Sequence, residues 1–306
     1  MNQANSNSSD IEFAKKVARY ALSWLIFIKE RFSPISHIPM ILLFCSGTAT
    51  LASVSDFQSI SYASVLAFLF FFRLRLFDEI KDYELDKVIN PTRPLPRQVL
   101  TIFDLKIFII LGLIAEYNII QNLLPDALRA WVIAALWSLF MYKEFFIPKL
   151  IRPYLTTYAT THTLVTFPLT LALIAGMNES AVIQTSDLWA SFGAWLVFNI
   201  FELGRKTFQA NEERGNVESY SKVWGKTGAV ALVLAQAFLA AYSFERSYPY
   251  FTSTIYLYIP AILLFLASIY FLLSKSKVSG LIYRASSSVF IILIYTILTI
   301  SPYLGS

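Results

Sequence analysis

Cysteine, charge and glycine are all scarce in this chain of 306 residues. The single cysteine, Cys45, excludes an internal disulfide and any cysteine-rich metal centre. Charged residues make up only 15% of the chain, whereas soluble globular proteins carry about a quarter. The 10 glycines rarely interrupt the apolar runs, which disfavours a transporter built on broken spans. An ordinary soluble protein is therefore excluded.

Apolar residues dominate the chain. Hydrophobic residues form 56% of it and aromatic residues 16%, and the mean hydropathy is +0.57. The apolar stretches are spread evenly, and no polar block is long enough to fold separately. We therefore predict one polytopic membrane domain over residues 33–306, with membrane lipid as its surroundings.

The amino-terminal residues have a different character. Residues 1–10 are polar and predict a disordered tail, and no signal-peptide cleavage pattern follows them. Residues 11–32 interleave five basic residues with aromatic ones, which predicts an amphipathic helix at the membrane interface. This segment is too charged to span the bilayer.

Nine runs are long enough to cross a membrane as helices. They centre on residues 37–55, 58–77, 104–123, 127–146, 154–176, 186–204, 227–245, 252–273 and 283–302. The predicted fold class is thus an all-α polytopic membrane bundle of about nine transmembrane helices.

The basic residues orient this predicted bundle. With a cytoplasmic amino terminus, only Arg129 and Arg246 of the 25 Lys and Arg residues fall on the outer side. An excess of basic residues in cytoplasmic loops is what the positive-inside rule requires. We predict an integral, multi-pass membrane protein with its amino terminus in the cytoplasm, in the inner membrane if the source is bacterial. The net charge of +5 then reflects orientation and phosphate affinity, with no nucleic-acid partner.

Three aspartates, Asp78, Asp82 and Asp86, recur every four residues after the second predicted span. A four-residue spacing on a helix separates side chains by only about 40°. Their oxygens can therefore converge on a divalent cation or a cation-bound polyphosphate. A proline-punctuated basic segment, NPTRPLP, follows at residues 90–96. The pattern favours a metal site over a solvated acidic helix end.

A second charged segment, residues 201–225, extends the sixth predicted span on the same side. Its charged residues are Glu202, Arg205, Lys206, Glu212, Glu213, Arg214, Glu218 and Lys222. Carboxylates that bind a cation beside bases that bind phosphate oxygens suit a metal-diphosphate complex. A cation pore would favour acidic residues without such adjacent bases.

The first cluster resembles the signature of the UbiA-type membrane prenyltransferases, Asn-Asp-x-x-Asp-x-x-x-Asp followed by an Arg-Pro-Leu-like turn. Here the motif reads Asp78-Glu79-x-x-Asp82-x-x-x-Asp86, and the turn contains Arg93-Pro94-Leu95. The spacing matches throughout, with Asp78 for the family's Asn and Glu79 for its Asp. The nine predicted spans and the placement of both clusters also match, so the resemblance covers nearly the whole chain.

The second cluster departs further from the family's Asp-x-x-x-Asp and glycine-containing turn. This chain offers Glu202, then Gly204-Arg205-Lys206, then Glu212-Glu213 before Gly215. Glu202 and Glu212 match best by their position relative to the sixth predicted span. Glutamate keeps the charge of aspartate but has a longer reach, and the register of this motif stays open.

The resemblance implies transfer of an isoprenoid group from a prenyl diphosphate to a lipophilic acceptor, an aromatic one included. It implies Mg²⁺ as the cofactor, with Mn²⁺ as the alternative. The implied catalytic residues are Asp78, Asp82, Glu202 and Lys206. The implied metal ligands are Asp78, Asp82, Asp86, Glu202 and Glu212. The implied phosphate donors are Arg93, Lys143 and Arg205. Cations at these ligands would neutralise the departing diphosphate.

The prenyl carbocation would also need aromatic faces, and the chain holds 26 Phe, 17 Tyr and 6 Trp residues. We expect Phe71, Tyr142 and Phe198 to serve, because they lie near the charged helix ends. His162, within an apolar stretch, fits a hydrogen-bonded core residue better than a base. Glu116, inside the third predicted span, is a costly carboxylate that is functional or bound to a neighbouring helix.

Two other functions remain open at this point. A membrane terpene cyclase would use the same ionising site but trap the cation within the prenyl chain. A transporter or a membrane scaffold is the third hypothesis, and it is disfavoured because the charges lie at the interface and away from the midplane. The acceptor, the prenyl chain length and the oligomeric state are not determined by the sequence.

Overall fold

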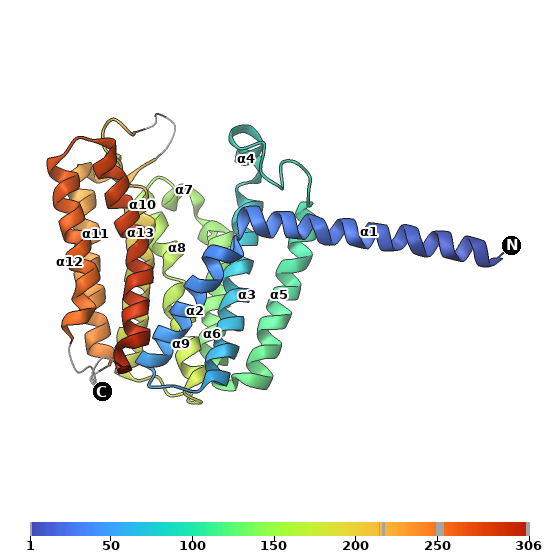
Figure 1. The fold of residues 1–306 in the computed structure, drawn as a ribbon, viewed down its shortest axis with the longest axis horizontal. Helices are drawn as coiled ribbons and strands as arrows, with labels where there is room; N and C mark the ends of the chain where they lie inside the picture. The colour runs from blue at the N-terminus through green and yellow to red at the C-terminus, as the bar shows by residue number, and fades with distance from the viewer. Residues whose placement is uncertain (1, 214, 216–217, 249–253, 304–306) are drawn as a thin grey trace. The chain divides into compact units, whose positions relative to one another are not determined.

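Helices make up the whole architecture. The computed structural model describes residues 2–213, 215, 218–248 and 254–303, and no strand occurs in this part of the chain. The helices, drawn in Figure 1, are α1 (Asn2–Arg31), α2 (Pro34–Leu51), α3 (Phe57–Lys81), α4 (Tyr83–Ile89), α5 (Ile102–Leu123), α6 (Leu128–Tyr142), α7 (Pro148–Ile151), α8 (Leu155–Thr163), α9 (Thr166–Met177), α10 (Thr185–Arg205), α11 (Tyr220–Ser247), α12 (Ile255–Leu273) and α13 (Lys277–Ile300). The predicted all-α class is confirmed.

The chain divides into two compact units. Unit 1 comprises Met1–Pro39 and Phe68–Glu116, and unit 2 comprises Met40–Ala67 and Tyr117–Ser306. The two acidic clusters fall in different units, the first in unit 1 and the second in unit 2. The single membrane domain predicted for residues 33–306 stays a prediction.

Within unit 1, α1 runs across α3 and α5 (Figure 1). The contact is aromatic: the Trp24 ring lies 3.8 Å from that of Phe108 and 6.4 Å from that of Phe72, centroid to centroid. The Tyr20 hydroxyl also donates to Asp104 Oδ1 at 3.1 Å. These contacts hold the carboxyl-terminal half of α1 against the two helices.

The predicted amino-terminal tail and interfacial helix both fall on α1, and the boundary between them stays a prediction. The helix α1 begins at Asn2, so it includes most of the predicted tail, residues 1–10, together with the predicted interfacial helix, residues 11–32. Trp24 and Phe27 are buried, whereas Phe13, Val17 and Tyr20 remain exposed. The amphipathic pattern therefore serves partly for packing on α3 and α5.

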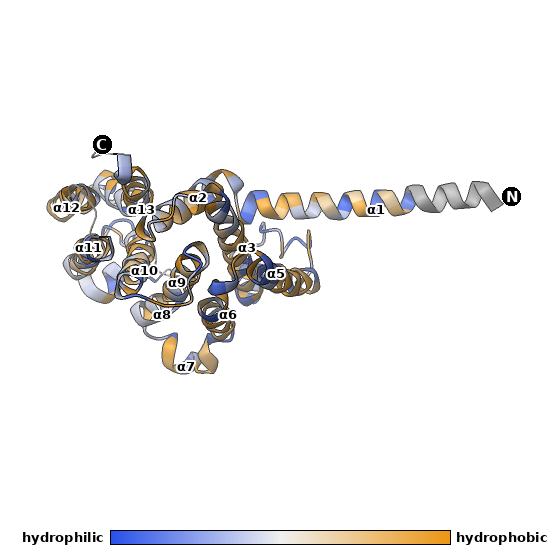
Figure 2. Cartoon of the chain, turned by 90° about the horizontal axis from the view of Figure 1, so that it is seen from below, coloured by the Kyte–Doolittle hydropathy of each residue, from blue (hydrophilic) through white to orange (hydrophobic). Residues whose placement is uncertain are grey.

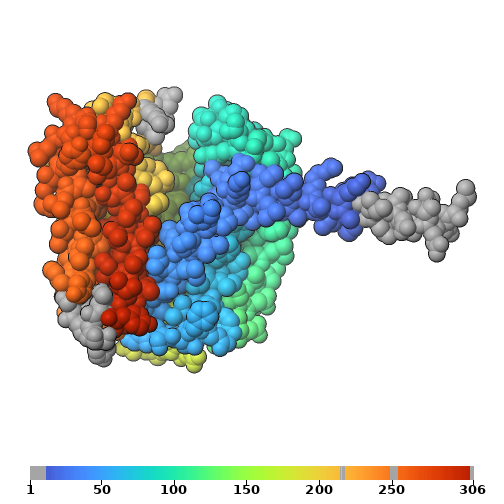
Figure 3. Space-filling view, viewed as in Figure 1, coloured from blue at the N-terminus to red at the C-terminus, as the bar shows by residue number. Residues whose placement is uncertain are grey.

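Unit 2 is centred on α10, which packs against α9, α11 and α13. Close approach depends on small residues: Gly193 lies against the Phe244 ring, and Gly204 lies against Ser287. Figure 3 shows α12 and α13 side by side. The side of α12 that faces away from α11 and α13 is apolar, with Ile262 and Leu266 exposed, and Figure 2 colours this helix as largely hydrophobic. Such a surface suits a lipid environment.

The predicted span over residues 154–176 is broken into α8 and α9. Threonine hydroxyls in α8 donate to backbone carbonyls one turn earlier, as Thr160 does to Thr156 at 2.9 Å, and such bonds bend helices. Pro168 adds to the break, because it has no N–H to bond the carbonyl of Leu164. The sequence contained both signals.

Six helices are long and apolar enough to cross a membrane within the described residues: Pro34–Leu51, Phe57–Lys81, Leu155–Met177, Tyr220–Ser247, Ile255–Leu273 and Lys277–Tyr303. The remaining predicted spans, 104–123, 127–146 and 186–204, coincide with α5, α6 and α10. Each predicted span therefore has its helix, while the number nine stays a prediction.

Candidate functional site

The first acidic cluster lies where α3 passes into α4. The helix α3 ends at Lys81, and Asp82 precedes the first residue of α4. Backbone bonds continue the helical turn across this break, from Asp82 N to Asp78 O at 2.9 Å and from Asp86 N to Asp82 O at 2.8 Å. The three predicted aspartates thus follow one another at successive turns, as their spacing predicts. Asp78 and Asp82 are exposed, whereas Asp86 is buried.

Asp86 is held by its own following turn. Its Oδ1 accepts a hydrogen bond from Asn90 Nδ2 at 2.9 Å, and its Oδ2 accepts one from Arg93 Nη1 at 2.5 Å. The Arg93 side chain is 29% exposed. Arg93, predicted as a phosphate donor, therefore anchors the turn to the motif, and its role toward phosphate stays a prediction.

Glu79 is a residue that sequence reasoning left out of the site. It is only 2% exposed, and its Oε1 accepts from Arg31 Nε at 2.7 Å and from Arg75 Nη2 at 2.5 Å. Its Oε2 is buried without a hydrogen-bond partner among the described residues. A buried carboxylate oxygen of this kind carries a desolvation cost, which a ligand would relieve. The family motif has an acidic residue at this position, which was the signal available.

The chemistry of these donors fits a hard divalent cation. Glu79 Oε2 lacks a partner among the described residues, and Asp82, one turn later, is exposed. Mg²⁺ is typically held by one or two carboxylates, with waters and substrate phosphates completing its ligands. No group of three or more His, Cys, Asp or Glu residues poised to hold a metal occurs within the described ranges. The donors therefore suit a cation that arrives with its substrate better than a closed metal site.

Asp82 also has an unusual electrostatic environment. Although Asp82 is exposed, desolvation by the protein around it raises the pKa of its carboxyl, as does the charge of Asp86. The charges of Lys81 and Arg93 oppose this rise. A carboxylate with a raised pKa gains more from a bound cation than an ordinary surface carboxylate does.

The second cluster begins at the end of α10, in unit 2. Glu202 Oε1 lies 2.7 Å from Lys206 Nζ, and Glu202 Oε2 accepts from Arg205 Nε at 2.8 Å and Nη2 at 2.5 Å. Arg205, a predicted phosphate donor, and Lys206, a predicted catalytic residue, therefore contact the same carboxylate. The backbone carbonyl of Lys206 accepts from Tyr220 N at 3.1 Å, which ties this helix end to the start of α11.

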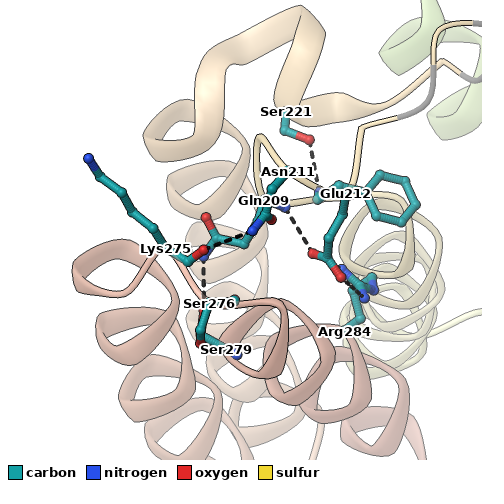
Figure 4. Close-up of polar contacts among 9 residues, drawn as sticks. Gln209, Asn211, Glu212, Ser221, Lys275, Ser276, Ser279 and Arg284 are labelled. Carbon is teal, nitrogen blue, oxygen red and sulfur yellow. Dashed lines mark hydrogen bonds and ion pairs between the residues drawn. The ribbon is translucent and has the colours of Figure 1, made fainter.

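Glu212 is part of a turn whose side chains bond to the end of α12 and to α13 (Figure 4). Its two oxygens form a bidentate pair with Arg284, at 2.8 and 2.7 Å, and its Oε2 also accepts from Gln209 N at 3.1 Å. The Gln209 side chain donates to the carbonyls of Phe271 and Ser274 and to the hydroxyl of Ser279. The bond to Arg284 lowers the pKa of Glu212. Glu212 therefore has structural partners, and its role as a metal ligand stays a prediction.

Glu213 has hydroxyl partners. Ser219 Oγ donates to both of its oxygens at 2.8 Å, and Ser221 Oγ donates to Oε1 at 2.6 Å. Lys222 Nζ lies 3.8 Å from Oε2. Ser219 in turn caps α11 by accepting from Lys222 N. Glu213 therefore fastens the loop to the start of α11.

Lys143, another predicted phosphate donor, lies in a strained loop between α6 and α7. Its ammonium group lies 4.9 Å from the centre of the Tyr142 ring. The next three residues, Glu144, Phe145 and Phe146, all have positive φ angles. Glu144 is buried and pairs with Arg152 at 2.6 Å. Strain of this kind persists only where neighbouring contacts enforce it.

The other residues singled out by sequence have packing roles in the structure. His162 Nδ1 lies 2.6 Å from the Tyr158 carbonyl and stacks on the Tyr158 ring, as expected of a core histidine. Glu116 binds a neighbouring helix through Arg73. The Phe198 ring packs on that of Phe44. The predicted facing of Phe71, Tyr142 and Phe198 toward a carbocation stays a prediction.

Comparison with known proteins yields one likeness at the level of the fold. A solved structure of a digeranylgeranylglyceryl phosphate synthase in membranes aligns with a TM-score of 0.65 and 19% identity, covering 94% of this chain and 98% of that one. No family model matches the sequence, and no curated protein matches it. The chain therefore shares the fold of that synthase. With its six apolar helices, it is an integral multi-pass membrane protein.

Proposed function

We propose that this chain transfers a prenyl group from an allylic prenyl diphosphate to a lipophilic acceptor within the membrane. The proposal rests on the first acidic cluster, in unit 1, where carboxylate oxygens remain available to a ligand. Asp82 is exposed at the end of an apolar helix, and Glu79 Oε2 is buried without a partner among the described residues. The fold shared with a membrane prenyltransferase supports it. We further propose a cytoplasmic amino terminus, as the distribution of basic residues favours.

The reaction makes one demand on the protein. The bond between C1 of the prenyl chain and the diphosphate oxygen breaks, and its electron pair leaves with the diphosphate. C1 then bonds to a nucleophilic atom of the acceptor, which releases a proton. Mg²⁺, or Mn²⁺ in its place, would supply the positive charge that stabilises the leaving diphosphate. The residues suited to contribute one or two carboxylate ligands to it are Asp78, Glu79 and Asp82.

Neighbouring residues fix the positions of the carboxylates in this motif. Arg31 and Arg75 fix Glu79 through Oε1, which leaves Oε2 as a ligand. Arg93 and Asn90 fix Asp86, so the turn after the motif is anchored to α4, which begins directly after Asp82. Prepositioned charges of this kind require little reorganisation when the leaving group develops its charge. Asp86, held in this way, supports the motif.

The test is a product assay with the purified protein in lipid nanodiscs and Mg²⁺. Geranyl, farnesyl and geranylgeranyl diphosphate are each offered with a lipid extract, and prenylated lipids are identified by mass. We expect Asp82→Asn to lower transfer at least about a hundredfold. Glu84→Gln, which changes an exposed carboxylate on the same helix, should change transfer by less than about twofold. No prenylated product from any donor, or an unaffected Asp82→Asn, would overturn the proposal, and a cyclic product without acceptor would show a cyclase instead.

A further inference from the structure

Three glutamates of the second cluster, Glu202, Glu212 and Glu213, differ from Glu79 in one respect: all their carboxylate oxygens have contacts. In Glu202, Glu212 and Glu213, each oxygen contacts an Arg, a Lys, a serine hydroxyl or a backbone N–H. In the first cluster, Glu79 Oε2 lacks a partner among the described residues. A cation at the second cluster would have to displace guanidinium, ammonium or hydroxyl groups from every ligand. These residues do not fit a metal.

The charge balance at the end of α10 favours an anion. Glu202 brings one negative charge, and Arg205 and Lys206 bring two positive charges within 2.7 Å of its oxygens. The three residues, here called the Glu202 triad, therefore carry an excess positive charge. A phosphate group would be attracted to this excess, whereas a divalent cation would find both oxygens of Glu202 already occupied by cationic side chains.

The two cationic side chains of the triad are more exposed than its carboxylate. The side chains of Arg205 and Lys206 are 46% and 36% exposed, whereas that of Glu202 is 18% exposed. The cations are therefore open to a ligand, and the carboxylate lies behind them. The Arg205 guanidinium also lies 5.6 Å from the centre of the Phe201 ring, and the Lys206 carbonyl is bound by Tyr220 N. The first contact restricts the guanidinium of Arg205, and the second fixes the backbone that carries Lys206.

We infer that the Glu202 triad is a metal-free anion site, in which Arg205 and Lys206 bind a diphosphate and Glu202 is the internal counter-ion that the diphosphate replaces. Arginine offers paired N–H donors to phosphate oxygens, and lysine offers a mobile point charge. Glu202 is then a positioning residue for two cations and not a metal ligand. The identity of the anion as the substrate's diphosphate rests on the proposed function.

Glu212 and Glu213 complete this arrangement as scaffold residues. Glu212 fastens the turn at Gln209 to Arg284 of α13, and Glu213 fastens the loop to the cap of α11 at Ser219. Each carboxylate of the cluster that the family pattern would assign to a metal thus has another task here.

The test measures binding separately from catalysis. Titration calorimetry with the full-length protein in nanodiscs follows inorganic pyrophosphate in the presence of EDTA, and Mn²⁺ alone in a second series. The variants are Glu202→Gln and the double variant Arg205→Gln/Lys206→Gln. The control is Glu218→Gln, which changes an exposed carboxylate of the same segment.

We expect Glu202→Gln to tighten metal-free pyrophosphate binding about two- to tenfold, because it removes the competing carboxylate of two partly exposed ion pairs. The double variant should weaken binding at least about tenfold. Glu218→Gln should bind like the wild type, and Mn²⁺ binding should be unchanged by Glu202→Gln. If Glu202→Gln does not fold, the double variant decides, because loss of binding there still locates the anion.

Two results would overturn the inference. Weaker Mn²⁺ binding in Glu202→Gln would make Glu202 a metal ligand. Unchanged pyrophosphate binding in the double variant would leave Arg205 and Lys206 as ordinary ion pairs at a helix carboxyl terminus, where cations are favoured in any case. A wild type that binds pyrophosphate through the triad but transfers no prenyl group would overturn the proposed function and leave this inference standing.

Discussion

A buried ion pair joins α3 to α5 within unit 1, and removing one partner should be far more costly than removing both. Arg73 Nε donates to Glu116 Oε1 at 2.7 Å and Arg73 Nη2 to Oε2 at 2.9 Å, with side chains 1% and 0% exposed. The guanidinium also lies 4.7 Å from the centre of the Phe70 ring. The pair thus holds two opposite charges that are both buried.

The magnitude follows from this burial. Glu116→Leu leaves the guanidinium of Arg73 buried without its counter-ion, and such a change costs about 3–5 kcal/mol. Arg73→Met removes the counter-ion of the buried Glu116 carboxylate, and we expect a similar loss in the free energy of unfolding. The double variant Arg73→Met/Glu116→Leu leaves no buried charge at this place, and replacing a whole buried pair by apolar residues is roughly neutral or stabilising by about 1–4 kcal/mol. The coupling free energy of the two substitutions should therefore exceed about 3 kcal/mol.

The assay is reversible unfolding in mixed micelles, followed by circular dichroism, for the four members of this double-mutant cycle. A matched cycle on Glu84 and Lys87, an exposed pair with side chains 79% and 43% exposed, should give a coupling below about 1 kcal/mol. Additive losses in the Arg73 and Glu116 cycle would refute the reasoning. They would mean that each charge finds other partners once its own is removed.

Two further predictions concern unit 2. Because Arg284 lowers the pKa of Glu212, their pairing stabilises the fold above the ordinary carboxyl value of 4.5 and is lost as pH falls below it. Acid unfolding should therefore begin at a higher pH in Arg284→Met, in which Glu212 has lost this stabilisation. If acid unfolding began at the same pH as in the wild type, the pairing with Arg284 would not be what stabilises the fold. Gly204→Ala should destabilise by about 1–3 kcal/mol in thermal unfolding, because its Cβ would overlap Ser287. Gly215→Ala, with open space around it, should be nearly neutral, and equal effects of the two would show that α10 and α13 can separate freely.

Much of the fold could be predicted because membrane helices are specified locally. A long apolar run has few ways to satisfy its backbone in lipid other than as a helix, so every predicted span coincides with helix. The break between α8 and α9 was also readable from Pro168 and the threonines before it. The division into two units was not, because it depends on packing between segments far apart in the sequence.

The sequence predicted which residues belong to the candidate site, but it predicted their ion-pair partners less well. The pairs of Glu202 with Arg205 and Lys206 lie one helical turn apart and are readable from spacing. The pairs of Glu79 with Arg31 and of Glu212 with Arg284 join residues 48 and 72 positions apart, and no local pattern announces them. A carboxylate that looks available in the sequence can therefore already be occupied, as Glu212 is.

The central claim is that the carboxylates at the end of α3 promote departure of the diphosphate with a divalent cation. Its most direct test is the initial rate of pyrophosphate release from an allylic diphosphate as Mg²⁺ is raised, for the wild type, Asp82→Asn and Glu84→Gln. The account predicts saturable Mg²⁺ activation in the wild type and Glu84→Gln, and release in Asp82→Asn lowered at least about a hundredfold. Mg²⁺-activated release in Asp82→Asn at the wild-type rate would contradict it.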